Sequence, residues 1–377
     1  MKKHKVFIMG TRGFPSLQGG VERHCEELYP LLQKDGFEIT LLARKRFYQP
    51  SDRLANWQNI HIKYFWSPKG QYFESFIHSL ICSIYIIIHR PSLVHVHNIG
   101  PGFFIPFLKL FHINIILSYH SRNYQHRKWN KFARYFLLIC EKLSIKYANK
   151  IIVVSSTSKE YLETRYGRKV TLIPNGIKKV PEVINTDIVR EFRLTAKKYI
   201  LFVGRISPEK GLEVLIPAFL ALETNVKKGN GEKWQLVIVG KSDNDDKYYD
   251  FLKSIARNSE NIIFTGFLEK AYLHGLYKQA GLFLLPSYNE GCSLSLLEAI
   301  SHRLPCMVSD IPENRQFEYS GLTLFKSGDI SDLLTKLSEF ISNSDYKPAI
   351  SLTYQNVPNW KNIADLTANE YNDVPLF

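Results

Sequence analysis

The feature that most constrains the fold is an alternation of short apolar runs with helical patterns along nearly the whole chain. This alternation is typical of βαβ units, which build mainly parallel sheets. The runs form two series and predict an α/β chain of two doubly wound domains. Strands are predicted at residues 5–9, 39–43, 93–97, 113–118 and 151–155, and then at 199–204, 235–240, 262–264, 282–285, 306–309 and 322–325.

A Pro-Asn-Gly turn at residues 174–176 separates the two series and indicates a hinge near residues 176–195. We therefore expect an N-terminal Rossmann-like domain over residues 1–180 and a C-terminal one over residues 181–358. A last helical pattern, residues 359–377, is predicted to pack back across the hinge.

Helix starts are predicted at Val21, near Phe73, within residues 129–147 and at Thr157. Thr157 and Glu160 have the spacing of a capping box. Pro30 lies inside the first helical pattern and predicts a kink or an early end there.

The net charge of +14 is divided unevenly between the two halves. Residues 1–180 hold 28 basic and 10 acidic side chains, a balance of +18, and the remainder hold 21 and 25, a balance of −4. A basic surface favours an anionic partner, either a membrane or a nucleic acid. No nucleic-acid recognition motif accompanies the charge, so we expect no nucleic acid.

The five cysteines are far apart and form neither a metal motif nor a dithiol pair, which favours a reducing compartment. The longest apolar stretch, residues 76–88, is too short to span a bilayer. We expect a cytoplasmic protein without a transmembrane helix, peripheral on the cytoplasmic face of the membrane.

Three segments carry candidate chemistry. The first predicted strand leads through a loop to Gly19-Gly20 at a helix start, where backbone N–H groups and the helix dipole favour an anion. A flexible turn explains these glycines equally well. Arg205 and Lys210 follow the strand at residues 199–204, where they can neutralise a diphosphate, although solvated surface charge is the simpler explanation.

The third segment is the most specific. A strand ends near Pro286, a loop carries Glu290, and a helix beginning near Ser293 carries Glu298. Carboxylates in this setting can accept hydrogen bonds from sugar and ribose hydroxyls. A single glutamate there would more often be merely solvated.

Together these segments resemble the retaining glycosyltransferases of family 4, which have the GT-B fold. The likeness runs from residue 5 to residue 371 and is strongest over 199–315. Residues 120–124 and 128–129 loosely resemble the rhamnosyltransferase-type subgroup. The resemblance implies two Rossmann-like doubly wound domains facing each other across a cleft. It places a nucleotide-diphosphate sugar mainly on the C-terminal domain and the acceptor on the N-terminal one.

The resemblance also implies residue roles. Arg205 and Lys210 would hold the donor diphosphate, Glu298 the nucleotide ribose and Glu290 the transferred sugar. His120, delivered by the strand at residues 113–118, would hydrogen-bond that sugar near the reacting carbon. His120 and Glu290 are thus the candidate catalytic residues. Further donor-binding groups would come from the backbone of Gly19, Gly20, Ser293 and Leu294.

The reaction expected is hexosyl transfer with retention by a same-face route, with the leaving phosphate helping to deprotonate the acceptor. Because fixed cations can stabilise the charge of the leaving diphosphate, we expect no metal or organic cofactor beside the donor substrate. Asp243-Asn244-Asp245 has the spacing of the metal motif of the other glycosyltransferase fold, but it lies in a polar loop. Cys292 stands where the family commonly has an aromatic residue, which leaves the sugar open.

A basic and aromatic segment follows His120. Aromatic residues interleave with cations here, which is typical of a helix on an anionic leaflet, although core packing explains the aromatic residues equally well. The surface predicted to meet a membrane or a lipid-linked or glycan acceptor comprises Arg122, Arg127, Lys128, Trp129, Lys131 and Arg134.

Two other classes of function remain open. A nucleotide-sugar epimerase or phosphorylase shares this two-domain architecture, and a non-catalytic nucleotide-sugar-binding protein would keep part of the site. The leading prediction is a glycosyltransferase acting on a lipid-linked or surface-polysaccharide precursor, such as one for lipopolysaccharide. The nucleotide, sugar, acceptor and oligomeric state do not follow from the sequence.

Overall fold

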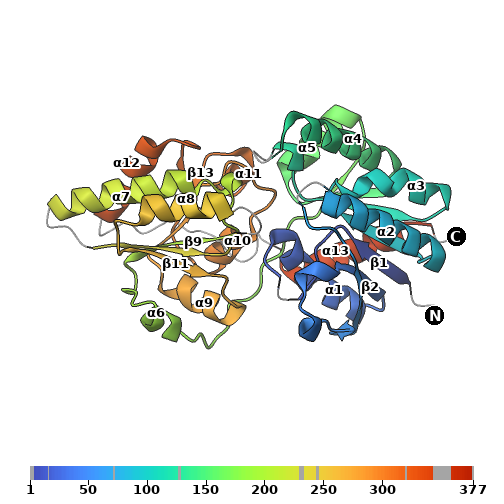
Figure 1. Ribbon diagram of the computed structural model, residues 1–377, viewed down its shortest axis with the longest axis horizontal. Helices are drawn as coiled ribbons and strands as arrows, with labels where there is room; N and C mark the ends of the chain where they lie inside the picture. The colour runs from blue at the N-terminus through green and yellow to red at the C-terminus, as the bar shows by residue number, and fades with distance from the viewer. Residues whose placement is uncertain are drawn as a thin grey trace. The chain divides into compact units, whose positions relative to one another are not determined.

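A computed structural model describes residues 4–15, 17–70, 73–125, 129–228, 233–242, 246–318, 321–342 and 358–375. The chain forms two units (Figure 1). The N-terminal unit comprises Met1–Gly176 and Pro358–Phe377, and the C-terminal unit comprises Ile177–Val357. The last helix therefore belongs to the N-terminal unit, and the division falls four residues before the predicted boundary at residue 180.

The N-terminal unit is built on a sheet with the order β3-β4-β2-β1-β5-β6-β7-β8. All neighbouring strands are parallel except β3 and β4. Short apolar runs form the central strands because both faces of a parallel sheet are covered. The strands are β1 (Lys5–Met9), β2 (Glu38–Arg44), β3 (Asn56–Trp57), β4 (Ile60–Phe65), β5 (Leu93–His97), β6 (Ile115–Tyr119), β7 (Lys150–Val153) and β8 (Thr171–Leu172).

Two groups of helices cover this sheet. Val94 and Val96 of β5 belong to the apolar core that includes Cys82 and Ile86 of α2 and Ile145 of α4. His95 and His97 alternate with those valines and contact α1 and α13, which pack against each other (Figure 1). The helices are α1 (Gly20–Lys34), α2 (Phe73–His89), α3 (Ile105–Leu110), α4 (Lys131–Tyr147), α5 (Ser156–Tyr166) and α13 (Trp360–Asn372).

The C-terminal unit is built on an all-parallel sheet with the order β11-β10-β9-β12-β13-β14. Its strands are β9 (Tyr199–Val203), β10 (Gln235–Val239), β11 (Ile262–Gly266), β12 (Leu282–Leu285), β13 (Cys306–Ser309) and β14 (Thr323–Phe325). Its helices are α6 (Asp187–Glu191), α7 (Leu212–Lys228), α8 (Asp246–Ala256), α9 (Lys270–Gln279), α10 (Leu294–Ser301), α11 (Pro312–Arg315) and α12 (Ile330–Ser342). The predicted α/β class with two doubly wound sheets is confirmed.

Two local predictions are wrong. The first is the early end at Pro30: helix α1 continues to Lys34, because Leu28, Tyr29 and Leu32 are buried and keep this turn packed, while the kink at Pro30 stays a prediction. Helix α5 is capped by Ser155 rather than by Thr157, since the Ser155 hydroxyl accepts the Ser158 N–H at 3.3 Å.

Each sheet has a topological switch point, where successive crossovers leave a strand in opposite directions. It lies between β1 and β5 in the N-terminal unit and between β9 and β12 in the C-terminal unit. Loops at the carboxyl ends of such strands diverge and leave room for a ligand. The residues after β1, β5, β9 and β12 are therefore where a site is expected.

Gly10, directly after β1, tests how closely β1 packs against β5. Its φ is +102°, and a Cβ added there would lie 2.0 Å from the carbonyl oxygen of His97. Gly36 has a similar φ of +98° but open space around it. Gly36→Ala should cost about 1–2 kcal/mol from backbone strain alone. Gly10→Ala should cost roughly 2 kcal/mol more, because overpacking adds to the same strain. Denaturant unfolding measures both, and equal losses would contradict the close packing of β1 on β5.

Candidate active site

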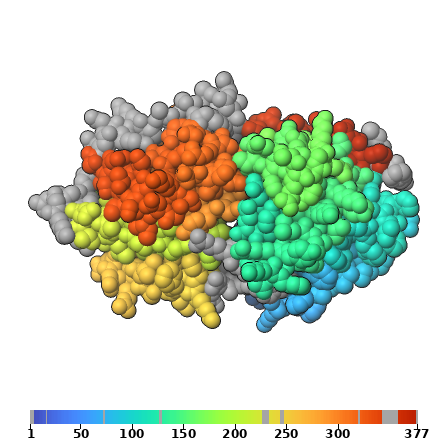
Figure 2. Space-filling model, turned by 90° about the horizontal axis from the view of Figure 1, so that it is seen from above, coloured from blue at the N-terminus to red at the C-terminus, as the bar shows by residue number. Residues whose placement is uncertain are grey.

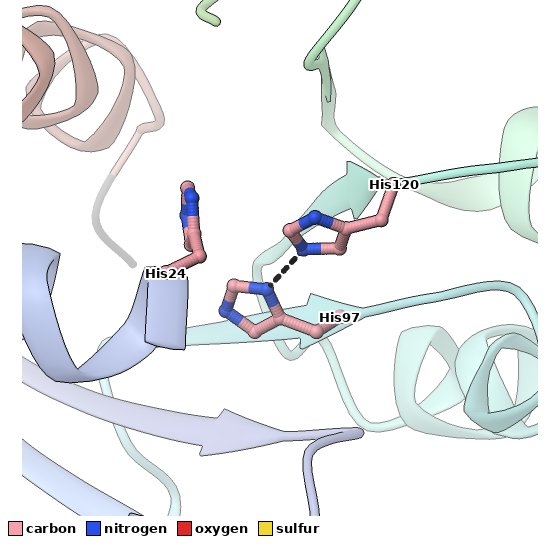
Figure 3. Close-up of side chains that lie close together, drawn as sticks. All are labelled: His24, His97 and His120. Atoms are coloured by element: carbon pink, nitrogen blue, oxygen red, sulfur yellow. Dashed lines mark hydrogen bonds between the residues drawn. The ribbon is translucent and has the colours of Figure 1, made fainter. Parts of the chain in front are cut away.

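The N-terminal candidate site is a cluster of buried imidazoles at the β1/β5 switch point. His97 ends β5, and His120 follows β6, the next strand in the sheet. His24 comes from the first half of α1 (Figure 3). We call His24, His95, His97 and His120 the histidine cluster; their exposed fractions are 4%, 0%, 0% and 8%.

Hydrogen bonds hold the cluster in place. Nδ1 of His97 lies 2.8 Å from Nε2 of His120, the contact drawn in Figure 3. Nδ1 of His24 lies 2.8 Å from Oδ1 of Asn175, while its Nε2 is buried without a hydrogen-bond partner among the described residues. The His24 ring packs edge-on against His120 and against Trp360 of α13.

Two tyrosines extend the network beneath these rings. The Tyr29 hydroxyl of α1 lies 2.5 Å from Nε2 of His97 and 3.0 Å from Nδ1 of His95. Tyr371 of α13 contacts the same His95 nitrogen at 2.6 Å. The other nitrogen of His95 lies 2.8 Å from the Ser118 hydroxyl.

Burial keeps these imidazoles neutral at pH 7. It lowers the pKa of His24 to about 4 and that of His95 to about 3. Burial, and secondarily the neighbouring imidazoles, lower the pKa of His97 and His120 well below the ordinary value. A neutral imidazole offers one donor and one acceptor, so the cluster is suited to orienting hydroxyl groups.

His24, His97 and His120 also lie close enough to be considered for a metal ion, with one nitrogen from each within 4.8 Å of the others. The facing nitrogens of His97 and His120, however, are hydrogen-bonded to each other. One of them therefore carries a proton and cannot bind a metal in this state. Asp243–Asp245, the other metal candidate in the sequence, lies outside the described residues.

The glycine pair before α1 is shaped by a carboxylate. Gly19 has a φ of +152°, which residues with a side chain rarely adopt, and a Cβ there would also meet Oε2 of Glu22 at 1.9 Å, so this position favours glycine. Glu22 folds back and accepts the Arg12 N–H at 3.1 Å and the Thr11 hydroxyl at 3.3 Å. Gly20, in contrast, has open space where a side chain would stand. A ligand could approach the backbone at Gly20, while Gly19 serves the fold of the loop.

The C-terminal candidate site centres on an ion pair at the β9/β12 switch point. Nζ of Lys210 lies 2.6 Å from Oε1 of Glu290, and both side chains are largely buried. The Ser287 hydroxyl donates to the same oxygen at 2.6 Å. Gly211 lets the segment after β9 lie close to the loop after β12, because a Cβ there would lie 2.1 Å from the Pro286 carbonyl oxygen. We call Lys210, Ser287 and Glu290 the Lys210–Glu290 group.

Four further predicted donor residues belong to the same unit. Arg205 is half-buried directly after β9. Ser293 is the N-cap of α10, and Leu294 is its first residue. Glu298, farther along α10, accepts a hydrogen bond from the buried Tyr277 hydroxyl at 3.2 Å. Helix α10 thus presents its N-terminus and a fixed carboxylate on neighbouring turns.

The residues of the predicted membrane surface differ in how exposed they are. Lys131 and Arg134 are exposed on α4, whereas Arg122 lies over the Tyr161 ring at 4.4 Å and Trp129 is half-buried. Arg127 and Lys128 lie outside the described residues. Glu141, the acid of this segment, is fully buried and accepts hydrogen bonds from Tyr119, Tyr161 and Tyr166.

The aromatic side chains of this region divide in the same way. Phe103, Phe104 and Phe136 form an aromatic cluster with Phe76 of α2, in which Phe104 is buried and the other three rings are half-buried. Others remain exposed on or beside α2, α3 and α4, which lie next to one another (Figures 1 and 2). The large apolar side chains exposed there, aromatic and aliphatic, are Phe73, Ile84, Ile88, Phe107, Leu110, Phe111, Phe132, Tyr135 and Tyr147, with Phe132 at 79% and Leu110 at 75%. None of the helices in the described ranges is both long and apolar enough to cross a membrane.

Sequence reasoning missed most of the histidine cluster. It identified His120 from the family resemblance and from its place after a strand, but not His24, His95 or His97, nor the tyrosines that contact them. The sequence Leu93-Val-His-Val-His97 held one signal: histidines alternating with valines inside a buried strand place polar rings on one covered face.

Two family models match successive halves of the chain. "Glycosyltransferase Family 4" matches residues 18–179, and "Glycosyl transferases group 1" matches residues 184–355. Among solved structures, the sucrose-phosphate synthase of Thermosynechococcus elongatus covers 98% of both chains with a TM-score of 0.81 and 21% identity. The HepE protein of Anabaena in complex with UDP-glucose covers 98% of this chain and all of its own, with a TM-score of 0.77 and 15% identity. The fold is thus the GT-B fold of glycosyltransferases, and the chain belongs to glycosyltransferase family 4.

Curated relatives are also glycosyltransferases, although the substrates in their names differ. The UDP-Gal:alpha-D-GlcNAc-diphosphoundecaprenol alpha-1,3-galactosyltransferase of Escherichia coli is 25% identical over 88% of this chain and 87% of its own length. The chain spans 62% of a glycosyltransferase of Methanocaldococcus jannaschii, at 29% identity. It spans 63% of the 2-deoxystreptamine N-acetyl-D-glucosaminyltransferase of Niallia circulans, at 26% identity. The likeness to the rhamnosyltransferase-type subgroup stays a prediction.

The lowered pKa values predict a pH-dependent stability. Between pH 6.5 and about 4 the unfolded chain protonates His95 and His24, whereas the folded chain leaves them neutral. The unfolded state then binds more protons, so stability is constant above pH 7 and falls as the pH drops. Each such histidine costs about 1.4 kcal/mol per pH unit. Thermal unfolding from pH 8 to pH 5 measures the slope.

His95→Gln should lower the slope of stability against pH by about 1.4 kcal/mol per pH unit, the contribution of one histidine. His61→Gln is the matched control, because His61 is exposed on β4 and solvated in both states. A stability that stays flat from pH 7 to pH 5 would contradict the neutral state of the buried imidazoles.

Proposed function

We propose that the protein transfers a hexosyl group from a nucleotide-diphosphate sugar to a lipid-linked or surface-polysaccharide precursor, with retention of anomeric configuration. The observation that carries the proposal is the Lys210–Glu290 group at the β9/β12 switch point. It combines a largely buried ammonium with a hydroxyl-binding carboxylate beside a helix N-terminus. A sugar diphosphate offers the matching groups, hydroxyls beside two phosphates.

Each donor-binding residue has a role suited to its place. Arg205 and Lys210 neutralise the diphosphate, and the backbone N–H groups at Ser293 and Leu294 add the dipole of α10. Glu290 accepts hydrogen bonds from hydroxyls of the transferred sugar. Glu298, oriented by Tyr277, does so from the ribose.

In the N-terminal unit, Gly20 offers backbone contact to a phosphate, and His120 hydrogen-bonds the sugar near its reacting carbon. The open space at Gly20 and the place of His120 after β6 support these roles. Departure of the diphosphate leaves an oxocarbenium-like sugar and concentrates negative charge on the phosphates. Fixed cations stabilise that charge without reorganisation, and the leaving phosphate takes the acceptor proton on the same face.

Thermal-shift screening with nucleotide sugars, followed by assay on polyprenyl-diphosphate sugars, tests the proposal. NMR of the product should show the donor's anomeric configuration, and EDTA should leave the rate unchanged. An inverted product would overturn retention, and a rate abolished by EDTA would overturn metal independence. Free epimerised nucleotide sugar, phosphate-dependent transfer, or binding without turnover would each overturn transfer in favour of an epimerase, a phosphorylase or a binding protein.

Two substitutions separate the partners of the ion pair. Lys210→Ala should lower both nucleoside-diphosphate affinity and turnover, the latter roughly 100-fold, because a fixed cation is lost. Glu290→Gln should lower turnover similarly but leave nucleoside-diphosphate affinity equal or higher, since Lys210 loses a competing carboxylate. Calorimetry with UDP, GDP, dTDP and ADP measures affinity. Weaker nucleotide binding by Glu290→Gln would contradict this division of roles.

We propose further that α2, α3 and α4 dock on an anionic membrane, where a lipid-linked acceptor would lie. The burial of Glu141 supports this proposal, because it leaves the exposed cations of α4 without that acid beside them. Lys131, Arg134, Lys142 and Lys146 are exposed there. The exposed aromatic side chains beside them suit the interfacial region of a bilayer.

Replacing Phe132 and Tyr135 together by serine should weaken binding to anionic vesicles roughly tenfold or more, because two interfacial aromatic side chains are lost. Flotation with phosphatidylglycerol vesicles measures the bound fraction. Phe251→Ser is the matched control, since Phe251 is 48% exposed on α8 of the other unit. Binding that is unchanged in the double variant, or absent in the wild type, would contradict docking through α4.

A further inference from the structure

The histidine cluster contains a continuous chain of hydrogen bonds that ends at His120. Tyr29 contacts His97 through Nε2, and His97 contacts Nε2 of His120 through Nδ1. Every group in this chain is buried. Within the described residues, Nδ1 of His120 makes no hydrogen bond, so it is the end at which a substrate group can be bound.

The direction of the chain follows from which groups carry protons. Burial raises the pKa of the Tyr29 hydroxyl well above its ordinary value, so that hydroxyl always holds its proton. It can donate that proton to one nitrogen, and the contact with His97 is shorter than the contact with His95. Nε2 of His97 is therefore the acceptor.

The rest of the assignment follows without conflict. If Nε2 of His97 accepts, its Nδ1 carries the proton and donates it to Nε2 of His120. Nδ1 of His95 then carries a proton that it donates to the oxygens of Tyr29 and Tyr371, and its Nε2 accepts the hydroxyl proton of Ser118. Each bond has one donor and one acceptor, and Nδ1 of His120 is left with a proton.

We propose that Tyr29 and His97 are positioning residues, which hold His120 in the tautomer whose Nδ1 carries the proton. His120 then acts toward the sugar as a neutral hydrogen-bond donor rather than as a base. The proposal rests on the proposed function for the role of His120, but the tautomer itself can be observed without any activity. The alternative tautomer would reverse the chain and present a bare nitrogen at the same place.

The direct test is ¹⁵N NMR of the full-length protein labelled at histidine, with the His120 signals identified by their loss in His120→Asn. In the wild type Nδ1 of His120 should carry the proton and Nε2 should not. Tyr29→Phe removes the first donor with little change of volume, and should leave His120 as a mixture of both tautomers. Tyr371→Phe is the matched control, because it removes a buried hydroxyl that contacts His95 and not His97.

Kinetics provide the second readout. Tyr29→Phe should lower kcat roughly three- to tenfold, the equivalent of one hydrogen bond, with KM nearly unchanged. His97→Leu should lower kcat by roughly tenfold or more, and His97→Asn should recover much of the loss, since its amide N–H stands where Nδ1 stood. If His97→Leu does not fold, the Tyr29→Phe result decides.

Three results would overturn the proposal. The first is a wild-type His120 with its proton on Nε2. The second is a His120 tautomer that Tyr29→Phe leaves unchanged. The third is stoichiometric zinc binding that is lost in His24→Ala, which would make the cluster a metal site. If no sugar transfer is found but the NMR results hold, the proposed function fails while the positioning role stands.

Discussion

The requirement that buried polar groups be hydrogen-bonded organises the N-terminal unit. Histidines placed on the covered face of β5 would each lose water and gain nothing without partners. Helix α1 supplies Tyr29, Asn175 reaches His24, and Tyr371 comes from α13, almost three hundred residues after β5. The result is a hydrogen-bonded array of neutral rings from β5, the end of β6 and helix α1.

The C-terminal unit solves a different electrostatic problem. A cation is costly to hold in a largely buried place, and Glu290 offsets that cost by pairing with Lys210. The same carboxylate is oriented by Ser287. Pairing therefore fixes both side chains before a donor arrives, and it couples the group that would bind the phosphate to the group that would bind the sugar.

Sequence patterns predicted the fold well because buried parallel strands are short, apolar and flanked by turns, as at residues 93–97 and 282–285. The family resemblance assigned candidate roles to Lys210, Glu290 and His120, and the sequence pattern placed each of them after a strand of its own sheet, at the edge where sites form. They could not predict the pairing of Lys210 with Glu290 or of His95 with Tyr371, since contacts between distant segments depend on packing rather than on local periodicity. The predicted cap of α5 was wrong for a local reason. Serine and threonine are both good N-caps, and α5 begins at Ser156, soon after β7 ends at Val153, so Ser155 rather than Thr157 takes the capping position.

Helix α13 also affects how the chain can be made. Trp360 and Tyr371 leave the ribosome only after the whole C-terminal unit has been synthesised. Until then His24 lacks its ring contact with Trp360 and His95 lacks its contact with Tyr371, and the face of α1 that α13 covers stays open to water. The C-terminal unit, whose residues are contiguous, can close first. The N-terminal unit is thus translated first but finishes folding last. A nascent chain would therefore need protection from aggregation longest in its N-terminal half.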